Sequence, residues 1–96
     1  MIKNYKFDTM DEYNAFIETV KKVDAKLTKY AGKGGVATVA LCRYDGDPDQ
    51  IYYYETSEFL ANRASVEAVP VWAEIHCPDW LRYIVFEDCP EAPDYL

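Results

Sequence analysis

Residues 36–55 read VATVALCRYDGDPDQIYYYE, and this stretch decides the fold class of the chain. The segments 36–44 and 50–55 are rich in β-branched and aromatic side chains, which favour strands. The residues between them, DGDPD, are turn formers, because Gly46 can take a positive φ and Pro48 fixes its own φ. We therefore predict a β-hairpin whose acidic tip is exposed to solvent.

An amphipathic helix is predicted before the hairpin, over about residues 10–30. Thr9 and Glu12 have the T-x-x-E spacing of a capping box, which marks a helix start. Apolar residues then recur at steps of three and four along one face: Tyr13, Phe16, Ile17, Val20, Val23, Leu27 and Tyr30. Gly32 or the glycine pair after it ends the helix. This glycine run follows a helix and precedes a strand, so it is not the strand-loop-helix arrangement that binds phosphate.

The flanking segments complete an α+β pattern. Residues 2–7 are predicted to form a first strand, 57–63 a short helix and 81–88 a last strand. The residues up to about 76 are predicted to be helical or irregular, because Pro70 interrupts any continuous helix. The order β-α-β-β-α-β favours a ferredoxin-like plait, in which two helices cover one face of a four-stranded antiparallel sheet and the other face is open. The alternative is an α+β sheet with an extra strand at about 66–75.

Length and composition predict a single α+β domain over residues 1–96, with a short acidic, proline-rich tail at about 89–96. No apolar run approaches the roughly 18 residues of a membrane span. The N-terminus MIKNYKFD lacks the apolar region of a signal peptide. We therefore expect a cytoplasmic protein without a membrane partner.

The net charge of −7 is unevenly distributed. Residues 1–44 hold eight Lys/Arg and five Asp/Glu, which leaves +3, whereas residues 45–96 hold two Arg and twelve Asp/Glu, which leaves −10. Direct nucleic-acid binding is disfavoured, because affinity for phosphates comes from lysine and arginine. A basic protein is the partner that this charge favours.

Metal sites are not expected. Asp45, Asp47 and Asp49 resemble the start of a calcium loop, but Gln50 and Thr56 stand where an EF-hand needs its glycine and its bidentate glutamate. The three aspartates are therefore interpreted as a solvated turn.

Cys42, Cys77, Cys89 and His76 could supply a zinc site, but they lack the close C-x₂₋₄-C spacing that such sites usually use. Buried, reduced thiols are the preferred interpretation. A cysteine enzyme would have to pair His76 with Cys42 or Cys89, because neighbours such as His76 and Cys77 point in different directions. We predict no catalytic residue, no metal and no cofactor, and a small thiol- or metal-dependent enzyme is the third hypothesis.

Three consecutive tyrosines follow the acidic turn, and on a strand the middle one must face away from the other two. Tyrosine is enriched at the energetic centres of protein interfaces. We predict that Tyr52 and Tyr54 face outward from the open side of the sheet. The predicted partner-binding residues are Asp45, Asp47, Asp49, Tyr52, Tyr54 and Glu55, with Glu87 and Asp88 on the last strand as secondary contributors.

The leading hypothesis is a small acidic binding protein, without catalytic activity, that occludes a basic surface of a nuclease or another nucleic-acid-binding protein. Phage-encoded inhibitors of restriction or CRISPR effectors, and immunity proteins against nuclease toxins, have comparable size and charge. The alternative is an oligomerising adaptor or subunit, such as a homodimer formed through the open sheet face, in which acidity serves only solubility.

Overall fold

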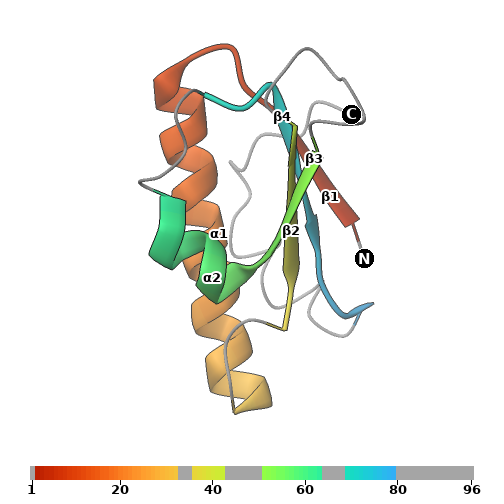
Figure 1. The fold of residues 1–96 in the computed structure, drawn as a ribbon. Helices are drawn as coiled ribbons and strands as arrows, with labels where there is room; N and C mark the ends of the chain where they lie inside the picture. Colours follow the sequence, from red (N-terminus) through yellow and green to blue (C-terminus); the bar gives the residue numbers. More distant parts are fainter. Residues whose placement is uncertain (1, 33–35, 43–50, 64–68, 80–96) are drawn as a thin grey trace.

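A computed structural model of the chain describes residues 2–32, 36–42, 51–63 and 69–79. In this part of the chain the elements are β1 (Ile2–Lys6), α1 (Met10–Ala31), β2 (Thr38–Cys42), β3 (Ile51–Glu55), α2 (Thr56–Asn62) and β4 (Trp72–His76). The strands form one antiparallel sheet, and both helices lie on the same face of it (Figure 1). The predicted α+β class and the order β-α-β-β-α-β are confirmed.

The sheet has the strand order β1-β4-β2-β3. β4 lies between β1 and β2, so that Glu74 faces Asn4 on one side and Ala40 on the other. β2 then pairs with β3 in the predicted hairpin, where Ala40 faces Tyr53. This strand order differs from that of the ferredoxin-like plait, although the layers are the same.

β4 is the main correction to the sequence-based prediction. The segment up to residue 76 was expected to be helical or irregular, but Trp72–His76 is a strand, close to the alternative placement at 66–75. Its burial alternates, with Ala73 and Ile75 fully buried between partly exposed neighbours, which is the period of a strand with one face on the core. Val71 extends the ladder, because its amide donates to the carbonyl of Cys42 at 2.7 Å. The strand predicted at 81–88 lies outside the described residues.

The boundaries of α1 confirm the predicted helix and its caps. The hydroxyl of Thr9 accepts a hydrogen bond from the amide of Glu12 at 3.2 Å. The carboxylate of Glu12 accepts from the amide of Asp8 at 2.6 Å, one residue before the position that the capping box predicts. At the other end Gly32 adopts φ 79°, and its amide donates to the carbonyl of Thr28 at 3.2 Å. A left-handed glycine therefore closes the helix.

The core lies between the helices and the sheet. The described residues that form it are Tyr5, Phe7, Tyr13, Phe16, Val20, Val23, Leu27, Ala37, Val39, Leu41, Phe59, Ala73, Ile75 and Cys77. Phe16 lies at its centre and contacts the rings of Tyr5, Phe7 and Phe59 at centroid distances of 5.0, 5.1 and 5.9 Å. Aromatic packing thus holds α1 to both β1 and α2.

α2 follows β3 without a loop. It begins at Thr56, one residue earlier than predicted, and the Thr56 amide donates to the carbonyl of Ala37 at 2.9 Å. The Thr56 hydroxyl donates to a carboxylate oxygen of Asp24 on α1 at 2.9 Å. Thr56 is fully buried, so these two bonds fix the position of α2 against α1 and β2.

Neither of the helices in the described ranges is long and apolar enough to cross a membrane.

Candidate functional site

The sheet face opposite the two helices, which we name the outer face, carries alternate residues of all four described strands. Its residues form three rows across the sheet in the order β1, β4, β2, β3: Ile2, His76, Thr38 and Glu55; Asn4, Glu74, Ala40 and Tyr53; Lys6, Trp72, Cys42 and Ile51. Ala40 and Cys42 are fully buried without belonging to the core between helices and sheet. These two positions of the outer face are therefore covered, whereas the sequence-based prediction left this face open.

Tyr53 is the tyrosine of β3 that points outward. Its relative exposure is 66%, the largest among the exposed large hydrophobic residues of the described segments. Tyr54 instead packs against the core, and its ring centroid lies 6.2 Å from that of Phe59. Tyr52 shares the helix-facing side with Tyr54 and is 36% exposed at the edge of the described sheet. The prediction that Tyr52 and Tyr54 face outward is therefore wrong, and Tyr53 takes that place.

The pairing partner explains why Tyr53 faces outward. On β2 the larger residues Val39 and Leu41 point to the core, so the small residue between them, Ala40, points outward. Tyr53 pairs with Ala40 and must therefore share its face. The signal was present in the sequence of the hairpin, because the side of the larger β2 residues determines the side of every β3 residue.

Acidic groups lie close to Tyr53. Glu55 is exposed on the same face of β3, two residues further along the strand. Glu74 lies in the same row as Tyr53, beyond Ala40, and its carboxylate contacts His76 Nε2 at 2.8 Å. The pattern of alternate residues in WAEIH could have predicted this Glu74–His76 contact, but only once that segment was recognised as a strand.

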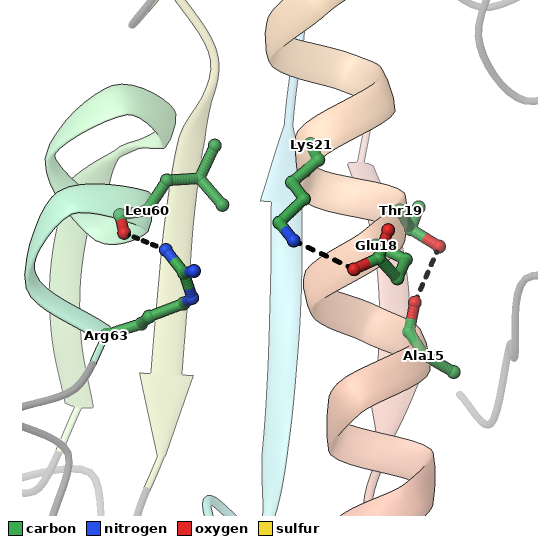
Figure 2. A network of polar contacts seen from close by, with 6 residues as sticks. All are labelled: Ala15, Glu18, Thr19, Lys21, Leu60 and Arg63. Atoms are coloured by element: carbon green, nitrogen blue, oxygen red, sulfur yellow. Dashed lines mark hydrogen bonds and ion pairs between the residues drawn. The ribbon is translucent and has the colours of Figure 1, made fainter.

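Basic side chains of the described segments lie mainly elsewhere. Arg63 folds back at the end of α2 and donates to the carbonyl of Leu60 (Figure 2). On α1 the Lys21 ammonium lies 2.9 Å from the Glu18 carboxylate and holds the pKa of that carboxyl below its usual value, and the charge of Arg63 acts in the same direction (Figure 2). Arg63, one of the two arginines after residue 44, thus interacts with the helices and does not neutralise acidic groups on the outer face.

Of the other predicted binding residues, Asp45, Asp47, Asp49, Glu87 and Asp88 lie outside the described residues. Glu55 is the predicted carboxylate that the structure places, and it is exposed as expected. Among the predicted carboxylates, the structure thus places Glu55 on the same face as Tyr53.

Cys42, Cys77 and His76, which lie in the described segments, do not come together. Cys42 faces Trp72 on the outer face, and His76 lies four residues further along β4, about 13 Å away at the usual rise per strand residue. Cys77 belongs to the core on the opposite side of the sheet. Within the described segments no three His, Cys, Asp or Glu residues are grouped so that they could hold a metal ion. Cys89 lies outside them, and the absence of a metal stays a prediction.

Cys77 gives a testable consequence of burial. Burial raises the pKa of the Cys77 thiol above the ordinary cysteine pKa of about 8.5. The folded protein therefore keeps this thiol neutral at pH values where the thiol of an unfolded chain ionises. The contribution of the neutral Cys77 thiol to the free energy of unfolding is fully present below the pKa of the unfolded chain. It falls as the pH rises toward the pKa of the folded protein, because in this range only the unfolded state releases the proton. We expect the Cys77 peptide to react with iodoacetamide at pH 8.5 far more slowly in the native protein than in denaturant, as measured by mass spectrometry. Equal rates in both states would contradict the buried position.

No protein-family model, curated protein or solved structure matches the chain. Function is therefore inferred from the outer face and from the charge distribution alone.

Proposed function

We propose that this protein is a small acidic binding protein, without catalytic activity, that occupies a basic nucleic-acid-binding surface of another protein. The observation that supports the proposal best is the outward Tyr53, 66% exposed, beside the exposed Glu55 on the same face of β3. An apolar anchor beside a carboxylate is the combination that a basic protein surface can bind.

The charge distribution supports the same partner class. The twelve acidic residues after position 44 are opposed by two arginines, one of which folds back onto α2. Local negative potential steers a basic partner during diffusion and raises the association rate by a factor of about 10 to 1,000 at low salt. Carboxylates can occupy the positions that phosphates take in a nucleic-acid channel, and such an inhibitor would act by competition.

A second candidate is self-association through the outer face, as in an oligomerising adaptor. Ile2 on this face is 54% exposed, and together with Tyr53 it presents apolar surface at both sides of the described sheet. Sedimentation of the purified protein at several concentrations distinguishes the candidates. Self-association would be favoured if the parent forms a stable dimer and the substitutions Tyr53→Ala and Ile2→Ser make that dimer dissociate.

Competition with nucleic acid tests the leading proposal. We expect a pull-down from native lysate to enrich a nucleic-acid-binding protein, identified by mass spectrometry, and added duplex DNA or RNA to displace it. Reversing Asp45, Asp47 and Asp49 to Lys should slow association with that protein by about tenfold or more at low salt and flatten the salt dependence. Circular dichroism should show an unchanged fold, because the sequence predicts an exposed turn at these residues and substitutions in such turns usually change stability by about 0.5 kcal/mol or less.

The matched control reverses three exposed acidic residues of the helical layer, Asp8, Asp11 and Glu18, to Lys. It changes the net charge equally but leaves the hairpin and the outer face intact. If both variants lose the same share of the association rate, total charge acts and the hairpin has no special role. A folded hairpin variant that binds as fast as the parent would contradict the proposal.

A further inference from the structure

We propose that Tyr53 and Glu55 together recognise an arginine side chain of the basic partner, in preference to a lysine. The inference rests on the proposed function and specifies the chemistry that the partner must present. It requires that the tyrosine ring be open to solvent, that the carboxylate lie within reach of a group stacked on the ring, and that no nearby cation occupy either one.

The geometry of β3 meets the first two requirements. Tyr53 and Glu55 point to the same side of the strand, so their Cα atoms lie about 7 Å apart at the usual rise of two strand residues. A guanidinium that stacks on the ring of Tyr53 can therefore direct its N–H groups toward the Glu55 carboxylate. The 66% exposure of Tyr53 leaves a ring face available for this contact.

The surroundings in the described segments meet the third requirement. Across the sheet, Glu55 faces Thr38 and Tyr53 faces Ala40, and neither of these residues carries a charge. Lys6, the lysine in the outer-face rows, lies on β1, three strand spacings or about 14 Å from β3. The described residues thus place no cation beside Tyr53 or Glu55, and we infer that a partner supplies it.

Tyr30 on α1 provides an internal comparison. It is 51% exposed, and the Lys29 ammonium lies 5.2 Å from its ring centroid. This exposed tyrosine is thus already matched by a cation of its own chain. Tyr53 has a carboxylate beside it instead, which favours a cation from outside.

Arginine suits this pair better than lysine for physical reasons. A guanidinium is planar, stacks on aromatic rings, is weakly hydrated and can donate two parallel hydrogen bonds to one carboxylate. A lysine ammonium is a compact, strongly hydrated charge that must lose water to contact the ring. The difference should appear as selectivity between peptides of identical charge.

The experiment compares two peptides of equal length and charge, one alternating glycine with arginine and the other glycine with lysine, by isothermal titration calorimetry at low salt. We expect the parent protein to bind the arginine peptide about fivefold more tightly, from stacking and bidentate bonding at an exposed site. Tyr53→Ala and Glu55→Gln should each reduce this preference to less than about twofold. Tyr53→Phe should retain most of it, because the ring face remains.

Tyr30→Ala is the matched control, an exposed tyrosine that should leave the preference unchanged. Equal binding of both peptides by the parent, with affinity lost in the hairpin Asp-to-Lys variant, would overturn the arginine inference while supporting the proposed function. Binding of neither peptide would contradict both. A preference that survives Tyr53→Ala in a folded protein would place arginine recognition elsewhere and overturn the assignment to Tyr53 and Glu55.

Discussion

Replacing Phe16 by alanine is expected to lower the free energy of unfolding by about 3–5 kcal/mol, the usual cost of removing a buried phenylalanine ring. Phe16 is fully buried, and its ring contacts those of Tyr5, Phe7, Tyr13 and Phe59. The substitution would leave a cavity between α1, β1 and α2 that surrounding rings can fill only in part. Since natural domains are stable by about 5–15 kcal/mol, this loss is a large share of the total.

Urea unfolding followed by circular dichroism measures this effect. Phe16→Leu keeps most of the volume and should cost much less, about 1.5 kcal/mol, which provides a measurable value if the alanine variant does not fold. Asn14→Ala, at an exposed position of the same helix, is the control and should change stability by about 0.5 kcal/mol or less. A loss below about 1 kcal/mol for Phe16→Ala would contradict the central position of the ring.

The parts of the fold that were predicted correctly are those whose signals are local. α1 is specified by signals within its own sequence: the cap at Thr9, the apolar face that includes Phe16, and the closing Gly32. Its range was therefore predicted to within one residue. The hairpin was likewise marked by turn residues between two β-rich segments. In both cases local preference and tertiary packing agree.

β4 was predicted only as the alternative, a strand at about 66–75, because its signal is not local. WAEIH alternates, but Pro70 and the helix-compatible spacing of Val69, Trp72 and Ile75 obscure a strand of five residues. Its place is decided by pairing with β1 and β2, which are distant in sequence. Propensity carries no information about such long-range partners.

The candidate site shows the same division. Exposure of Glu55 was expected from the charge of its side chain, whereas the orientation of the tyrosines depended on which side of β2 packs on the core. An error of one position in that choice moves every residue of β3 to the other face, which is why Tyr54 was predicted outward and Tyr53 inward.

Replacing Thr56 by valine is expected to lower the free energy of unfolding by about 1.5–3 kcal/mol, the range for loss of a hydrogen bond to a charged group. The Thr56 hydroxyl is fully buried and donates to the Asp24 carboxylate at 2.9 Å. Valine keeps the shape of threonine and the backbone bond to Ala37, so the change isolates the hydroxyl. Because Asp24 is half-buried, water can replace the lost donor in part, and we expect a value toward the lower end.

A double-mutant cycle tests the assignment. Thr56→Val should cost clearly less in an Asp24→Ala background than in the parent, because the carboxylate that needs the hydroxyl is then absent. Ser57→Ala, the exposed neighbour in the first turn of α2, is the control for a general effect on that helix. If Thr56→Val costs the same in both backgrounds, the hydroxyl acts through another group. In that case α2 would be held to α1 by apolar packing such as that of Phe59 on Phe16, and the bond between the helices would have no part in positioning the strand that carries Tyr53 and Glu55.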